Sequence, residues 1–160
     1  MKLISNSVEE TIEIGEEIAA KLKKGDVVAL IGNLGSGKTV LTKGIAKGLG
    51  VKDVRYVNSP SFVIIKEYKG KIPLYHFDLY RLDKAHSLDP LSYDEYFYGR
   101  GVTVIEWADK IRKLLPKKYL EIRLSAAGEN KRKVEMLWVR FSRSQFSVSS
   151  FPISKRSGSK

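Results

Sequence analysis

Short apolar runs alternate along the chain with segments in which apolar residues recur at helical spacing. The run at 27–31, Val-Val-Ala-Leu-Ile, is rich in β-branched residues and lies between glycines, which predicts a buried strand. Apolar positions three or four residues apart predict a helix from Ser7 to about Gly25, where the glycine ends it. A second helix is predicted from near Gly37 to about Gly48.

The remaining pattern predicts more strands than helices. We expect strands at 2–5, 62–65, 72–79, 102–105, 119–125 and 133–141, a turn at 68–71, a weak helix within 82–99 and a short helix ending at Pro116. Strands separated by helices favour parallel pairing, whereas strands joined by short turns favour antiparallel pairing. We therefore predict a three-layer α/β fold with a mainly parallel sheet and antiparallel flanking strands.

A glycine-rich loop joins the first buried strand to the second helix. Its sequence is Gly32-Asn33-Leu34-Gly35-Ser36-Gly37-Lys38-Thr39, the pattern that cradles phosphates in P-loop NTPases. Glycines let backbone N–H groups converge on an anion, and the helix N-terminus adds the positive end of its dipole. Lys38 would reach the β- and γ-phosphates, and the Thr39 hydroxyl would bind Mg²⁺. A plain Gly/Ser turn is the alternative, but the order of strand, loop and helix favours a P-loop NTPase-type fold.

Two carboxylates stand at strand ends, where open α/β sheets bind their ligands. Asp78 and Glu106 each follow an apolar strand. Asp78 fits a role in holding Mg²⁺, directly or through water, and Glu106 fits a second metal contact or the orientation of an attacking water. With Lys38 they form the predicted catalytic set, and with Thr39 they form the predicted metal site. The alternative is that each carboxylate caps the turn or helix that follows it.

Three further features are less decisive on pattern alone. The segment Ser59-Pro60-Ser61-Phe62 could be a switch ordered by the γ-phosphate, or an ordinary Ser-Pro turn. His76 lies within a predicted strand and is expected to be structural rather than catalytic. Trp107 could pack on the core or lie beside the nucleotide.

Length and composition bound the remaining choices. The 160 residues predict one domain over 1–141 and a basic, Ser-rich tail over 142–160 that we expect to be poorly ordered. The chain has no cysteine, so thiolate chemistry and thiolate metal sites are excluded. No apolar run approaches 18 residues and no signal sequence is evident, so we expect a cytosolic protein without a membrane partner. The net charge of +11 suits an anionic partner such as a nucleotide or RNA, and a basic surface that only keeps the protein in solution is the alternative.

The motifs together resemble one family over about residues 3–140. The glycine-rich loop, the segment at 59–62, His76-Phe77-Asp78-Leu79-Tyr80-Arg81-Leu82 and Glu106-Trp107 occur in the order and spacing of the TsaE (YjeE) family, P-loop ATPases of bacterial tRNA threonylcarbamoyladenosine synthesis. Thr11 and Gly15 match the family too. Ser61 replaces the usual threonine of the Ser-Pro-Thr segment, and the tail has no counterpart.

The resemblance implies a weak, Mg²⁺-dependent ATPase that helps the proteins TsaD and TsaB, and that meets tRNA only through their complex. It implies that Lys38 and Thr39 bind phosphate and metal, and that Asp78 and Glu106 are the metal-side carboxylates. It places Thr11 near the adenine and Trp107 at the nucleotide. It also supports the switch interpretation of Ser59, Pro60, Ser61 and Phe62. The predicted cofactors are therefore ATP and Mg²⁺.

Two other function classes remain alternatives. A small-molecule kinase would need a lid with paired arginines, and Arg100 and Arg112 make no convincing lid. An ATP-switched RNA-binding module would suit the basic tail, but no RNA-recognition motif supports it. No arginine is clearly placed to assist hydrolysis, although Arg55 and Arg81 are candidates, and this agrees with slow turnover that partners stimulate.

Overall fold

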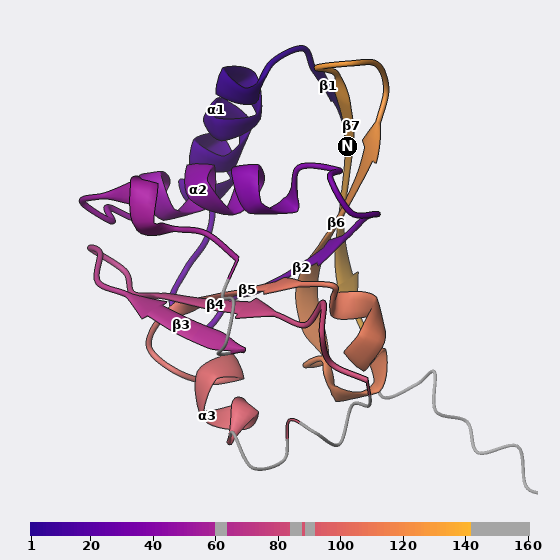
Figure 1. The fold of residues 1–160 in the computed structure, drawn as a ribbon. Helices are drawn as coiled ribbons and strands as arrows, with labels where there is room; N and C mark the ends of the chain where they lie inside the picture. The colour runs from indigo at the N-terminus through magenta and orange to yellow at the C-terminus, as the bar shows by residue number, and fades with distance from the viewer. Residues whose placement is uncertain (60–63, 84–87, 89–91, 142–160) are drawn as a thin grey trace, which may run out of the picture.

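The computed structural model describes residues 1–59, 64–83, 88 and 92–141 (Figure 1). Seven described strands form one sheet: β1 (Lys2–Ser5), β2 (Val27–Ile31), β3 (Ile65–Tyr68), β4 (Leu74–Asp78), β5 (Val102–Glu106), β6 (Lys118–Ala126) and β7 (Arg132–Arg140). The helical elements are α1 (Val8–Ala19), α2 (Lys38–Gly48) and α3 (Tyr93–Phe97), with 3₁₀ segments η1 (Val54–Tyr56) and η3 (Ala108–Leu114).

The strand order is β1-β7-β6-β2-β5-β4-β3. The four central strands β6, β2, β5 and β4 are parallel, whereas β3, β7 and β1 pair antiparallel at the flanks. Parallel register sets Leu30 of β2 and Asp78 of β4 on either side of Glu106 in β5. The loop that follows β2 and both predicted carboxylates therefore meet at one edge of the sheet.

Helices cover both faces of the sheet, as Figure 1 shows for α1 and α2 on one side and α3 on the other. Val28 and Leu30 of β2 pack into the core cluster that includes side chains of α1 and α2. Val27 and Ala29, which point the other way, pack with side chains of α3 and η3. Because β2 is buried on both faces, all of its residues are apolar and not only every second one. The predicted three-layer α/β fold is confirmed.

Two glycines let α1 and α2 cross in direct backbone contact. A Cβ added to Gly15 would lie 2.7 Å from the Cα atom of Gly44, and a Cβ on Gly44 would lie 2.2 Å from the carbonyl oxygen of Ile12. Both neighbours are backbone atoms, which cannot move aside as the end of a flexible side chain could. The contact fixes α2, and with it the loop at its N-terminus, against the first helix.

We expect Gly44→Ala to destabilise the fold, because the added methyl group has no space. Overpacking of this kind costs about 1–3 kcal/mol, which outweighs the gain in helix propensity of about 1 kcal/mol at most. Thermal unfolding should show a melting temperature several degrees lower. Glu13→Ala on the exposed face of α1 is the control and should leave it nearly unchanged. A variant as stable as the wild type would contradict the close helix contact.

Two predicted element boundaries were wrong. The helix from Ser7 ends at Ala19, not at Gly25, because the N–H of Lys23 donates to the Asp26 carboxylate and closes a separate turn. The strand predicted at 62–65 is β3 at 65–68, since Tyr68, expected in the turn, pairs with Leu74.

Other predictions fall outside the described part of the chain. The predictions concerned are the tail at 142–160 and residues 62 and 63 of the predicted strand. Within the described ranges, no helix combines the length and the apolar character that crossing a membrane requires.

Candidate functional site

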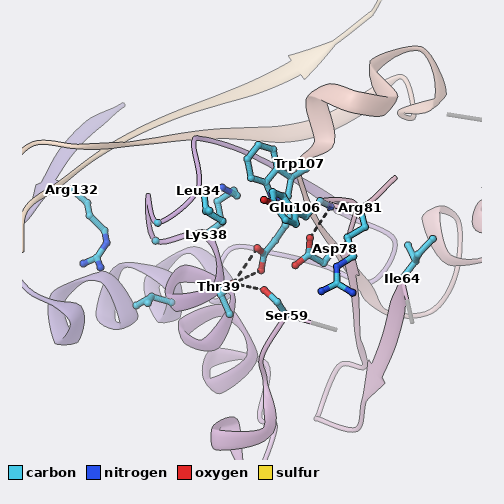
Figure 2. A pocket seen from close by; sticks show the side chains of 14 residues that line it. Leu34, Lys38, Thr39, Ser59, Ile64, Asp78, Arg81, Glu106, Trp107 and Arg132 are labelled. Atoms are coloured by element: carbon cyan, nitrogen blue, oxygen red, sulfur yellow. Dashed lines mark hydrogen bonds between the residues drawn. The ribbon is translucent and has the colours of Figure 1, made fainter. Parts of the chain in front are cut away.

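A pocket of about 510 Å³ opens at the edge of the sheet where β2, β4 and β5 end (Figure 2). Its lining comes from the glycine-rich loop with the start of α2, from the residues that end β4 and β5, and from single residues of three other segments. These residues are Leu34, Gly35, Gly37, Lys38, Thr39 and Val40; Asp78, Tyr80, Arg81, Glu106 and Trp107; and Ser59, Ile64 and Arg132.

The glycine-rich loop turns sharply into α2. Gly35 and Gly37 have φ angles of 77° and 102°, in the left-handed region that side chains disfavour. Gly37 is the N-cap of α2, and no side chain of the described residues caps this helix. The N–H groups of its first turn therefore remain available, and they carry the positive end of the helix dipole. This arrangement suits an anion at the loop.

The Lys38 ammonium lies inside the loop. It donates to the carbonyl oxygens of Gly32 at 2.6 Å and Asn33 at 2.9 Å, and it lies 4.1 Å from the centroid of a Trp107 ring. Burial lowers the pKa of Lys38, while the negative charges of Glu106 and other nearby carboxylates oppose this shift. The ammonium is thus held by weak, neutral acceptors that a phosphate oxygen can replace.

Glu106 is the polar centre of the pocket floor and is 2% exposed. Its two carboxylate oxygens lie 3.0 and 3.1 Å from the Thr39 hydroxyl, as the dashed lines in Figure 2 show. The Nε2 atom of buried His76 lies 2.9 Å from one of them. Because the Thr39 proton points to the carboxylate, the hydroxyl of Ser59, 3.0 Å away, donates to Thr39. This contact with His76 fixes the orientation of the Glu106 carboxylate.

Asp78 lies beside Glu106 in the parallel register and also lines the pocket. One of its oxygens accepts from the backbone N–H of Tyr80 at 3.0 Å, so this carboxylate does cap the following turn. The capping role and the pocket role coexist. Glu106 instead engages Thr39 and His76.

The hydroxyl and carboxylate oxygens of the pocket suit Mg²⁺, but they would need a bound nucleotide to complete its coordination. Hydroxyl and carboxylate oxygens are the groups that Mg²⁺ prefers. The described residues contain no cluster of three or more Asp, Glu, His or Cys side chains able to hold a metal ion by themselves. Phosphate oxygens and water would have to complete the coordination, as at other nucleotide sites.

Trp107 stands next to Glu106 in an unusual backbone conformation. Its φ of 61° lies in the left-handed region, which costs a bulky residue about 1–2 kcal/mol. The conformation turns the indole into the pocket, where it packs 5.2 Å from the Tyr80 ring and covers Lys38. Strain of this kind gathers at functional sites.

Comparison with known proteins identifies the family. The family described as threonylcarbamoyl adenosine biosynthesis protein TsaE matches residues 5–134. The chain belongs to the TsaE family.

Curated relatives agree with this assignment. The TsaE protein of Bacillus subtilis is 49% identical over 127 residues, which cover 79% of this chain and 78% of that protein. The TsaE protein of Treponema pallidum is 35% identical and covers 84% of this chain and 98% of its own length. Among solved structures, YdiB of B. subtilis matches with a TM-score of 0.72 and 41% identity over 87% of this chain and 84% of that one. The two TsaE proteins are thus similar to the chain in sequence, and YdiB is similar to it in both sequence and fold.

Most residues for which the sequence predicted a role at the nucleotide lie together. The pocket lining includes Leu34, Gly35, Gly37, Lys38, Thr39, Ser59, Asp78, Glu106 and Trp107. Asn33 and Ser36 are not on that lining, but both contact the Lys38 ammonium. Pro60, Ser61 and Phe62 lie outside the described residues, so the switch remains a prediction.

Thr11, predicted near the adenine, is not on the pocket lining. It is fully buried in α1, and its hydroxyl contacts the Ser5 hydroxyl at 2.6 Å and the Ser7 carbonyl at 3.0 Å. These bonds secure the start of α1. Contact with a nucleotide would require the hydroxyl to leave them.

The two arginines suggested by sequence separate in the structure. Arg81 lines the pocket, whereas Arg55 forms an ion pair with Asp53 at 2.7 Å and is not on the lining. Sequence reasoning missed Arg132, which lines the pocket from the start of β7. Its only signal in the sequence was a basic residue directly before a predicted strand. Ile64, Tyr80 and Val40 are further lining residues without a distinguishing pattern.

Proposed function

We propose that this TsaE family protein binds ATP with Mg²⁺ and hydrolyses it slowly, as a helper of the TsaB–TsaD complex that modifies tRNA. One observation carries the proposal. The glycine-rich loop presents Lys38 and Thr39 to the same pocket into which two neighbouring strands send Asp78 and Glu106. Cation, hydroxyl and carboxylates are the groups that phosphoryl transfer needs.

Each residue then has a defined task. The N–H groups of the loop and of the first turn of α2 bind the phosphates, and Lys38 exchanges its carbonyl acceptors for phosphate oxygens. Thr39, Glu106 and Asp78 would hold the Mg²⁺, directly or through water, and the metal would supply charge neutralisation at the phosphates. The carboxylate that does not contact the metal is free to orient a water for in-line attack on the γ-phosphate.

The small-molecule kinase alternative gains no support. Arg112, one of the arginines considered for a lid, contacts Glu121 of β6 at 3.2 Å. Neither Arg112 nor Arg100 is on the pocket lining. Neither of these two arginines therefore supports a kinase lid at this pocket.

Reconstitution with partners tests the helper role. We expect TsaB–TsaD to bind the chain more tightly with ATP than with ADP or without nucleotide, because a γ-phosphate changes the pocket that the partner would sense. We also expect ATPase activity to rise, by roughly 10³-fold or more if the partner supplies an arginine. Steady-state ATPase, partner binding in the three nucleotide states and modification of tRNA with and without the chain are the measurements. Equal binding in all three states with no rise in rate would refute the helper role.

A further inference from the structure

Arg132 reaches the pocket through the β6–β7 hairpin. It is the first residue of β7 and pairs with Ala126, the last residue of β6. Because β6 runs parallel to β2, the hairpin lies at the same edge of the sheet as the glycine-rich loop. A Cβ added to Gly37 would lie 2.3 Å from Nε of Arg132 and 2.5 Å from its Cδ. The missing side chain at Gly37 therefore makes room for the arginine.

The environment of the Arg132 guanidinium is electrostatically unfavourable unless an anion binds beside it. The guanidinium lies against the N-cap of α2, where the helix dipole is positive and repels a cation. Its Nε and Nη1 atoms are buried, and they have no hydrogen-bond partner among the residues that the structure describes. Buried donors of a charged group that stay unpaired destabilise a fold. By contrast, Arg123 of β6 is satisfied by Glu121 at 2.7 Å.

We infer that Arg132 binds the diphosphate part of the nucleotide, the part that ATP and ADP share. The inference rests on the proposed ATP-binding function and adds a residue to it. Figure 2 shows Arg132 on one side of the glycine-rich loop, with Asp78, Arg81 and Glu106 on the other. Because the carboxylates mark the side of metal and γ-phosphate, Arg132 meets the phosphates that are not transferred. Its planar fork of donors suits two oxygens of such a group.

Calorimetric titration of the full chain with ADP and with ATP tests this role. We expect Arg132→Ala to weaken ADP binding by about 10- to 100-fold, the usual effect of losing hydrogen bonds to a charged group, and ATP binding by a similar factor. Arg132→Lys keeps the charge but not the fork and should fall between this variant and the wild type. Arg140→Ala removes the same charge from the exposed end of the same strand and should bind both nucleotides like the wild type.

Thermal unfolding without nucleotide separates ligand binding from a structural role. Near the positive helix end, the Nε and Nη1 atoms of Arg132 have no partner within the described part of the chain, so Arg132→Ala should leave the melting temperature unchanged or raise it. A purely structural arginine would lower it. A variant that binds ADP like the wild type, or that weakens ATP alone, would overturn the assignment to the shared phosphates. Failure of the wild type to bind either nucleotide would instead refute the proposed function itself.

Discussion

Lys38→Ala is expected to reduce ATP hydrolysis by roughly 10³-fold or more and to weaken ATP binding, since it removes the ammonium that would meet the phosphates. Lys38 lies inside the glycine-rich loop and is held there by the carbonyl oxygens of Gly32 and Asn33. Losing these neutral contacts affects only the loop, because α2 is anchored by its packing on α1 and the sheet. The fold should therefore persist. Hydrolysis rates, nucleotide titration and circular dichroism measure the three effects.

A matched control lies on the same helix. Lys47 of α2 forms a surface ion pair with Glu16 at 2.7 Å and is not on the pocket lining. Surface pairs contribute about 0–1 kcal/mol, so Lys47→Ala should hydrolyse ATP like the wild type. If a folded Lys38→Ala variant hydrolysed ATP at the wild-type rate, the glycine-rich loop would not be the phosphate site.

Glu106→Gln should lower hydrolysis by roughly 10²- to 10³-fold and should affect nucleotide binding less, because the amide keeps the shape but loses the charge that a metal or an attacking water requires. Asp78→Asn should act in the same direction. The effect at Glu106 should be larger, since it is the carboxylate that contacts the Thr39 hydroxyl and is nearly fully buried. Rates measured over a range of magnesium concentrations, together with ADP affinity, separate the two effects.

Glu121 provides the comparison for a carboxylate buried in the same sheet. It is 7% exposed, pairs with Arg112 and Arg123, and is not on the pocket lining. Glu121→Gln should lower stability but leave hydrolysis per folded molecule unchanged. Wild-type rates in Glu106→Gln at every magnesium concentration would remove Glu106 from the site.

The sequence predicted the parts of the site that are continuous or that obey a simple rule of topology. The loop from Gly32 to Thr39 is a single stretch, so its shape follows from local glycines and the helix that comes next. Asp78 and Glu106 were predicted because both end apolar strands, and the parallel register of β4 with β5 brings them together. That pairing is nonlocal, but the rule for strand ends already implied it.

Other features depend on pairings that no local pattern contains. Arg132 enters the pocket only because β7 pairs with β6 in one particular register and Gly37 leaves space for its side chain. The left-handed backbone conformation of Trp107 could not be predicted either, because tryptophan rarely adopts it. The end of the first helix was misplaced because Gly25 suits a helix C-terminus, whereas the bond from Lys23 to Asp26 forms a separate turn before it.

The hydrogen bonds from Thr39 to Glu106 bear on the order in which ligands arrive. The Thr39 hydroxyl and the Glu106 carboxylate are already hydrogen-bonded to each other. A free cation would have to break these bonds, and the described residues offer no cluster of three or more Asp, Glu, His or Cys side chains to bind it in return. A cation bound to a nucleotide is already coordinated by phosphate oxygens and water, and this coordination offsets the loss of the hydrogen bonds. Metal and nucleotide should therefore enter as one complex, and the protein without nucleotide should discriminate poorly among free divalent ions.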